Sequence, residues 1–346
     1  MQHAVGREVG LDLARAGAVD SMYVAHTAPS PGPGNILELS EFLTAALFAT
    51  LVGAGAQLSA DHRGGGPWWR VHAAAVVRGA ALVVTGLLLE TWDAQVVIIL
   101  VYLGVLTVLM SAVARLPSWG VGVVAVAFLG VGPLLRDLAD AEWERRLRQG
   151  AQSGDLVPRV LEIAGAGDAY RIVTLVVWAC LGMLLVRRWT RRPGDAATAA
   201  PVPRAELVVV TVAGLAFAGA VLLGWPDAVA PYSGERLEVL VDAALAAAAV
   251  AGSLLVADLA FPGRGTSAQV GRMTLTLYVV QVGWLALVAR SRPGEPDDSW
   301  VTLVLLVVVS YAIAAAWPRV VRSGPFARGP LEGLVDLGAG ALRRRR

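Results

Sequence analysis

The sequence predicts an all-α protein, a polytopic integral membrane bundle of about ten transmembrane helices with both termini in the cytoplasm. Of its 346 residues, 56% are hydrophobic and only 16% are charged, and the mean hydropathy is +0.62. So few charged side chains cannot cover the surface of a soluble protein of this length. The apolar residues also gather in segments of about 20 residues, the length at which a helix crosses a bilayer.

The first of these segments, residues 9–28, contains four ionisable residues: Asp12, Arg15, Asp20 and His26. An Asp or Arg near a bilayer centre costs roughly 2.5–3.5 kcal/mol, so such residues normally face a bundle interior or a wet cavity. On a helix, Asp12, Arg15 and His26 share one face, whereas Asp20 points away and needs a different neighbour. We expect this helix to carry the function; packing of its charges against other helices is the simpler alternative.

Nine further apolar segments follow, separated by loops rich in Gly, Pro and charged residues. We expect spans at residues 36–58, 73–90, 94–114, 118–135, 168–187, 205–224, 237–259, 270–289 and 300–318. This divides the chain into six helices with the catalytic first one (1–187), a cytoplasmic linker (188–204), four more helices (205–318) and a basic cytoplasmic tail (319–346).

Arginines gather in alternate loops, and short cytoplasmic loops are rich in arginine. With the N-terminus inside, the inner segments hold Arg63, Arg70, Arg115, Arg187, Arg188, Arg191, Arg192, Arg204, Arg264 and Arg343 to Arg346. Arg15 then lies toward the cytosol and His26 toward the outer face. The long outer loop, residues 136–168, has a partly helical pattern; it either covers the outer mouth or lies on the surface as an interfacial helix.

Several kinds of site are excluded by residue type. The basic residues are all arginine, and a Walker-type phosphate loop needs a lysine. Cys180 is the single cysteine, so no disulfide framework or thiolate metal site is expected. The histidines lack the spacing of a zinc-binding helix, and we expect no metal; they are His3, His26, His62 and His72.

Four stretches carry a resemblance to a known family: REVGLDLARAGAVDSMYVAH at the start, RGAALVVTGLLLE from Arg78, GRMTLTLYVVQ from Gly271 and ARGPLE from Ala327. Together they resemble the membrane acyltransferases related to heparan-alpha-glucosaminide N-acetyltransferase, including the domain-of-unknown-function 418 branch and the acyltransferase-3 families. Ala16 stands where that family has Gly after the Arg. The resemblance implies transfer of an acyl group, here expected to be acetyl, from cytoplasmic acyl-CoA to a sugar or glycan-like acceptor outside, with a histidine serving the transfer.

Three arginines enter predicted spans from the cytoplasmic side: Arg15, Arg78 and Arg272. A guanidinium fork matches phosphate oxygens, and coenzyme A carries phosphates at the end of a long arm. The rise from Arg15 to His26, about 16 Å, is comparable to that arm. We therefore expect these arginines to bind acyl-CoA, with Asp12 as the partner of Arg15. The alternative for Arg78 and Arg272 is that they reach the membrane interface without a ligand.

An imidazole is well suited to remove a proton near neutral pH, so His26 is the expected general base; the alternative is a hydrogen-bonded histidine at a helix end. Tyr278 and Gln281 are candidate substrate-binding donors, with helix packing as their alternative role. Acyl-CoA is the expected cosubstrate. The other expected partners are membrane lipid and a glycan or small-molecule acceptor, and we expect no binding to nucleic acid. The expected location is the plasma membrane, and a homodimer is one possible oligomeric state. A small-anion transporter and a catalytically inactive structural protein are the competing functions.

Overall fold

The computed structural model describes residues 2–61, 67–152, 154–190, 203–225, 228–294 and 298–344, and in these ranges the chain is helix and loop without strands. The long helices are α1 (Gln2–Thr27), α2 (Leu39–Asp61), α3 (Trp68–Glu90), α4 (Leu100–Val113), α5 (Ser118–Arg148), α7 (Ile172–Thr190), α8 (Arg204–Gly224), α9 (Arg236–Ala257), α11 (Thr274–Ser291), α12 (Trp300–Val320) and α13 (Pro330–Arg344). The shorter ones are η1 (Pro33–Glu38), α6 (Leu156–Leu161), η2 (Glu162–Ala166), α10 (Arg264–Arg272) and η4 (Pro325–Ala327).

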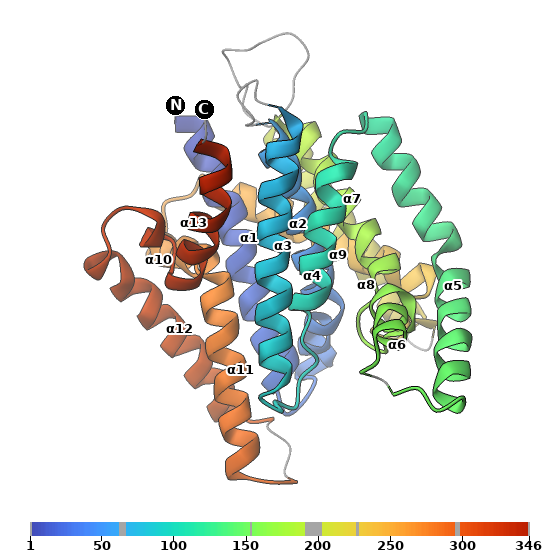
Figure 1. The fold of residues 1–346 in the computed structure, drawn as a ribbon. Helices are drawn as coiled ribbons and strands as arrows, with labels where there is room; N and C mark the ends of the chain where they lie inside the picture. Colours follow the sequence, from blue (N-terminus) through green and yellow to red (C-terminus); the bar gives the residue numbers. More distant parts are fainter. Residues whose placement is uncertain are drawn as a thin grey trace.

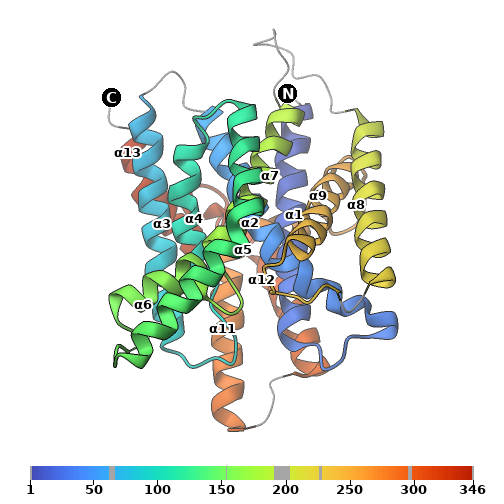
Figure 2. The same cartoon turned by 90° about the vertical axis from the view of Figure 1, so that its right-hand side faces the viewer.

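Each predicted span contains one long helix. Within the described ranges, eight helices are long and apolar enough to cross a membrane: α2, α3, α5, α7, α8, α9, α11 and α12. Two more complete the set, α1 with its ionisable residues and the shorter α4. The protein is therefore a multi-pass membrane bundle. Figures 1 and 2 place both ends of the chain at the same end of the bundle, as an even number of crossings requires. We call this the inner end and the opposite one the outer end.

Helix α1 lies in the interior and packs against α2, α9 and α10. Its inward face consists of buried residues, among them Ala14, Ala18, Val19, Met22 and Tyr23. By contrast, α5 and α12 stand at opposite sides of the bundle in Figure 1 and present exposed apolar side chains such as Val126 and Val301. Apolar surface of this kind is stable against lipid tails.

Small residues let neighbouring helices approach closely. An ideal Cβ on Gly53 of α2 would lie 1.8 Å from the carbonyl oxygen of Ala179, and one on Gly182 of α7 would lie 1.9 Å from that of Thr50. The Thr50 hydroxyl also donates to the Trp178 carbonyl at 3.2 Å. Without a hydrophobic force between helices in lipid, such close backbone packing supplies much of the attraction.

The spans differ from the prediction at their ends. Helix α4 begins at Leu100 and not near residue 94; the preceding residues form an irregular loop, with a positive φ at Asp93, that lines an outer cavity. Helix α5 continues past residue 135 to Arg148; Arg145 and Arg146 both pair with Glu142 one turn earlier, which supports the extra turns. Much of the predicted outer loop is therefore helix.

The expected ninth span is broken near its start. Met273 is not helical, with φ −99° and ψ 21°, so Arg272 ends α10 and does not open α11. The predicted basic tail contains α13, which packs on α3 and α11. It is held there by Glu332, which accepts hydrogen bonds from the backbone N–H and the hydroxyl of Thr276, at 2.9 and 2.6 Å. The buried setting raises the pKa of Glu332, although the bonds from Thr276 oppose that effect.

Candidate functional site

An aspartate in the inner half of α1 holds two arginines. Asp12 Oδ1 accepts a hydrogen bond from Arg15 Nη1 at 2.7 Å, and Oδ2 accepts one from Arg272 Nε at 3.0 Å. The Asp12 side chain is 14% exposed, whereas those of Arg15 and Arg272 are 31% and 39% exposed. Two of the predicted coenzyme-binding arginines thus meet on one carboxylate, and Asp12 is the partner of Arg15.

Arg272 reaches Asp12 because α10 crosses α1 at a glycine. An ideal Cβ on Gly271 would lie 1.8 Å from the Asp12 carbonyl oxygen and 3.1 Å from the Ala16 nitrogen. Cβ atoms essentially never come within 3.0 Å of another heavy atom, so a larger residue at position 271 would force the helices apart. Gly271 therefore permits the close contact between α10 and α1, and Arg272 next to it forms the ion pair with Asp12.

A second aspartate holds another pair of arginines. Asp336 of α13 accepts from Arg78 Nη2 at 3.2 Å and from Arg328 Nη1 at 3.3 Å. The third predicted arginine, Arg78, therefore pairs with the C-terminal helix and not with Asp12. Gln269 connects the two groups: its Oε1 accepts from Arg272 at 3.3 Å, and its Nε2 donates to the Arg328 carbonyl at 3.3 Å.

These residues form one network, which we call the inner arginine network; its ionic members are Asp12, Arg15, Arg78, Arg272, Arg328 and Asp336. Four guanidinium groups face two carboxylates, so the network has a surplus of positive charge. Partly exposed arginines with hydrogen-bonding capacity left over suit an anion with several oxygens, such as a phosphate.

At the other end of α1, His26 contacts Gln281 of α11. The Gln281 amide nitrogen lies 2.9 Å from His26 Nδ1. Gln281 is fully buried, and its Oε1 has no hydrogen-bond partner among the described residues. The predicted catalytic histidine and one predicted substrate-binding residue are therefore direct neighbours.

This contact determines which ring nitrogen of His26 carries the proton. An amide nitrogen can only donate, so Nδ1 accepts and the neutral ring carries its proton on Nε2. A half-turn of the Gln281 amide would present Oε1 to a protonated Nδ1 and leave the lone pair of Nε2 free, as a general base requires. Since Oε1 has no partner to lose, the half-turn breaks only the bond to the ring itself.

Tyr278 has a different partner. Its hydroxyl accepts a hydrogen bond from the Ile99 backbone nitrogen at 3.3 Å, and the side chain is 2% exposed. Tyr278 thus anchors the loop before α4, and Trp92 at the start of that loop packs against Gly283 of α11. We find Tyr278 supporting the wall of the outer cavity.

That cavity, of about 190 Å³, opens at the outer end of α3 and α4. Its polar lining is Glu90, Tyr102, Arg159 and Glu162. Arg159 pairs with both Glu90 and Glu162, and the Tyr102 hydroxyl donates to Glu162 at 3.4 Å. Burial opposes the charge of Arg159, but the bonds and charges of Glu162 and Glu90 outweigh it and raise the pKa of this guanidinium. Such a mixed lining of carboxylates, guanidinium and phenol can hydrogen-bond a polyhydroxylated molecule.

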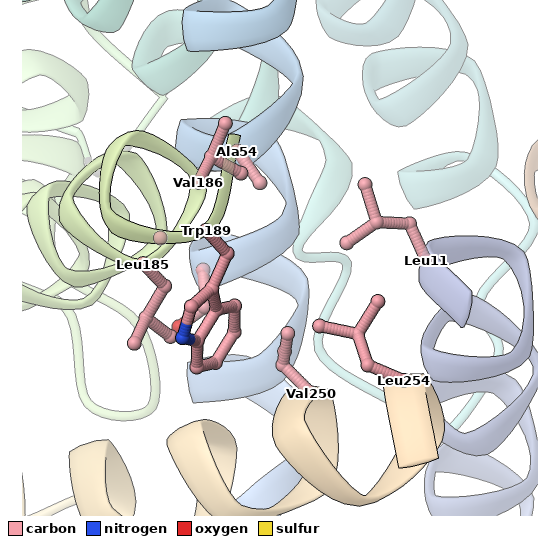
Figure 3. Close-up of a pocket in the computed structure, with 9 residues that line it drawn as sticks. Leu11, Ala54, Leu185, Val186, Trp189, Val250 and Leu254 are labelled. Atoms are coloured by element: carbon pink, nitrogen blue, oxygen red, sulfur yellow. The ribbon is translucent and has the colours of Figure 1, made fainter. Parts of the chain in front are cut away.

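A separate cavity in the inner half is small and apolar. Figure 3 shows Leu11, Trp189, Val250 and Leu254 around it. It measures about 30 Å³, whereas one water molecule needs roughly 10–15 Å³, so it has room for about two. In this form it cannot hold an acyl chain.

Asp20 faces the opposite side of α1. Its Oδ2 accepts a hydrogen bond from the Tyr311 hydroxyl of α12 at 2.9 Å. On the next turn, the hydroxyls of Tyr23 and Ser310 are 2.7 Å apart. Asp20 therefore has the separate neighbour that the helical wheel predicts, and it belongs to the α1–α12 contact.

The sequence analysis did not identify Gln269, Arg328 or Asp336 of the inner network, or Arg159 of the outer cavity. Gln269 lies three residues before Arg272, which gives it a place on the same helix face. Asp336 on α13 gave no such signal, because its contact with Arg78 joins residues 258 positions apart. Comparison with protein-family models, curated proteins and solved structures gives no match. Any role of the two ends of α1 is therefore inferred from sequence and geometry.

Proposed function

We propose that this chain is an acyltransferase of the plasma membrane. It moves an acyl group, here acetyl, from cytoplasmic acyl-CoA to a sugar or glycan-like acceptor on the outer side. The proposal agrees with the family that the sequence resembles, and it assigns each end of α1 a part in the reaction.

One observation carries the proposal: the two ends of α1 face the same partner segment. Toward the inner side, Asp12 and Arg15 meet Arg272 of α10; toward the outer side, His26 meets Gln281 of α11. The helix rise between Arg15 and His26, about 16 Å, is comparable to the length of the arm between the phosphates and the thioester of acyl-CoA. Two ligand-binding ends on one rigid helix would hold both parts of the coenzyme in register.

In this proposal the inner arginine network binds the phosphates of coenzyme A, and Asp12 keeps two guanidinium groups aimed at one place. Asp12 does not touch the coenzyme. After the half-turn of the Gln281 amide, Nε2 of His26 removes the proton from the acceptor amine or hydroxyl as the thioester carbonyl is attacked, while Gln281 Oε1 accepts from Nδ1–H. The carbon–sulfur bond of the thioester breaks, the acyl group passes to the acceptor, and coenzyme A leaves as the thiol after taking up a proton.

The outer cavity is the proposed acceptor site. Its polar lining includes Glu90, Arg159 and Glu162, and its wall is anchored by Tyr278, three residues before Gln281. A polyhydroxylated acceptor would exchange its hydrogen bonds with water for bonds to these groups.

A small-anion transporter is the second candidate. The surplus of positive charge in the inner arginine network favours it, because such charges attract any anion. The two candidates differ in what happens at His26. A transporter moves its anion without covalent change, whereas the acyltransferase leaves a labelled acceptor.

The deciding experiment uses the protein in lipid nanodiscs with radiolabelled acetyl-CoA and a panel of amino sugars and neutral sugars. We expect transfer by the wild type and a loss of ~10²–10⁴-fold in rate for His26→Ala and His26→Gln, as for removal of a general base. His72→Gln is the matched control, because His72 contacts Ser111 at the inner end of the bundle and has no place in the reaction. Near wild-type transfer in both His26 variants would remove the proposed base.

Binding is measured separately by titration with acetyl-CoA. Arg15→Ala should weaken it by about 1.5–3 kcal/mol, more than tenfold, and Arg15→Lys should restore only part, because the fork is lost. Arg319→Ala is the control, since Arg319 is exposed and donates to the Ala315 carbonyl of its own helix. Unchanged affinity in Arg15→Ala would reject the phosphate site, and absence of binding to the wild type would leave the anion transporter as the better candidate.

A further inference from the structure

Two acidic residues are buried together at the outer end of α9. Glu238 and Asp242 lie one helical turn apart, and each is only 2% exposed. Their carboxyl groups are within hydrogen-bond reach of each other. Glu238 Oε2 also accepts from the Gly234 backbone nitrogen at 3.2 Å. Neither residue contributes to the inner arginine network, to His26 or to the outer cavity.

The contact between the two groups requires a proton. Ionised carboxylates only accept hydrogen bonds, and two of them side by side repel. The buried Oδ1 of Asp242 has no N–H or O–H donor among the described residues. A single proton on Asp242 would turn the repulsion into a hydrogen bond to Glu238, whose other contact, the Gly234 N–H, favours the ionised form.

Among the neighbouring charges, Arg171 offsets part of the negative charge of Glu238, but one cation cannot balance two carboxylates. The titratable and charged groups that face it are Glu41 of α2, Tyr170 and Arg171 before α7, Tyr232 before α9 and Arg136 of α5. Arg171 donates to the carbonyls of Tyr232 and Asp168, at 2.8 and 3.0 Å, and Arg136 is paired with Asp137 and Glu235. Glu41 adds a further acidic group.

The remaining neighbours of α9 place their charges elsewhere. Those of α8 in the described range, Arg204 and Glu206, are at the opposite end of that helix. Asp20 of α1 is held by Tyr311 of α12. The pair is thus acidic and enclosed.

The space beside the pair is too small for a hydrated ion. Asp242 and Glu238 line a cavity of about 10 Å³ that reaches the partly exposed Glu41 and Ala169. A cavity needs roughly 10–15 Å³ to hold one water molecule, so one water at most fits there. A proton that is relayed by one such water needs no more space than this cavity offers.

We propose that Glu238 and Asp242 form a proton-binding site that exchanges with the outer side of the membrane. In its loaded state one proton is shared between the two carboxyl groups. On release, the proton passes to water at the outer mouth and leaves two carboxylates, so charge and atoms balance. The site is independent of the acyl-transfer proposal.

Infrared spectroscopy of the purified protein in nanodiscs tests this directly, because a protonated carboxyl group has a carbonyl stretch that a carboxylate lacks. We expect the wild type at neutral pH to show a band that disappears as the pH is raised, that is absent from Asp242→Asn, and that is shifted in frequency in Glu238→Gln, where the hydrogen-bond partner of Asp242 has changed. Glu235→Gln is the matched control: this carboxylate precedes α9, is 56% exposed and should leave the band unchanged. Other buried carboxyl groups, such as Asp20, cancel in the difference spectra.

Asn at position 242 can donate to Glu238 as the protonated acid does, so that variant should fold. If it does not, Glu238→Gln in the same measurement decides. A band that persists in folded Asp242→Asn, or that is unchanged in frequency in folded Glu238→Gln, would overturn the proposal. The direction of exchange is read in proteoliposomes after a pH jump outside or inside. The band should follow the outer pH in molecules inserted with their termini inside; a response to the inner pH alone would reject the outer connection.

Discussion

Replacing Gly271 by Ala tests whether the α1–α10 crossing organises the inner arginine network. The added Cβ would lie 1.8 Å from the Asp12 carbonyl oxygen, so α10 must move away by more than about 1 Å to restore ordinary contact. That movement would stretch the 3.0 Å bond between Arg272 and Asp12 beyond hydrogen-bonding range. Overpacking of this kind typically costs about 1–3 kcal/mol of stability.

The assay combines thermal unfolding of the purified protein with acetyl-CoA titration. For Gly271→Ala we expect a lower unfolding temperature and a weaker affinity, since Arg272 no longer shares Asp12 with Arg15. Gly265→Ala is the matched control on the same helix, because a Cβ there meets nothing within 4 Å. Replacing a helical Gly by Ala without a clash should be neutral or stabilising by up to about 1 kcal/mol.

Equal unfolding temperatures for the Gly271 and Gly265 variants would show that the crossing is not tight, and the geometric argument for Arg272 would fail. A destabilised Gly271→Ala variant with normal affinity would support the tight α1–α10 crossing but show that coenzyme binding does not depend on it.

Three further predictions concern anchoring, pH and orientation. Tyr278→Phe should cost about 1–3 kcal/mol in thermal unfolding, because the buried Ile99 N–H loses its acceptor; an unchanged stability would reject the anchoring role. Burial raises the pKa of Glu332, so the folded state binds more protons than the unfolded chain; stability should be highest in mild acid, fall as the pH rises through the folded pKa, and lose this slope in Glu332→Gln. A reporter fused at Gln152 should read as external and one at the C-terminus as cytoplasmic; the reverse result would exchange the roles assigned to the two ends of α1.

The architecture follows from the sequence to a large extent because hydropathy and arginine placement act locally. Every predicted span contains a long helix, and the shared face of Asp12 and Arg15 reflects simple helix geometry. The ends of helices were harder to predict. Met273 separates α10 from α11 inside the expected ninth span, two residues after the Gly271 crossing, which depends on the position of α1.

The polar networks were partly visible in the sequence. The proximity of Arg272 to Asp12 could be anticipated from the inferred topology, but their common ion pair could not, since it depends on which faces of α1 and α10 meet. Glu238 and Asp242 stood four residues apart at the start of a predicted span, a spacing that places both on one helix face. Their burial and mutual contact became evident only when α2, α7 and the segment before α9 were seen to enclose them.

The pairing of Arg78 with Asp336 has a consequence for biosynthesis. These residues are 258 positions apart, and a ribosome delivers the N-terminal one first, so α3 enters the membrane before its counter-ion has been synthesised. The first helix avoids this difficulty, because Asp12 and Arg15 neutralise each other within one turn. The emergence of α13 is then the event that completes the inner side of the bundle. A nascent chain that stops before α13 has made every span, but it lacks the Asp336 counter-ion of Arg78.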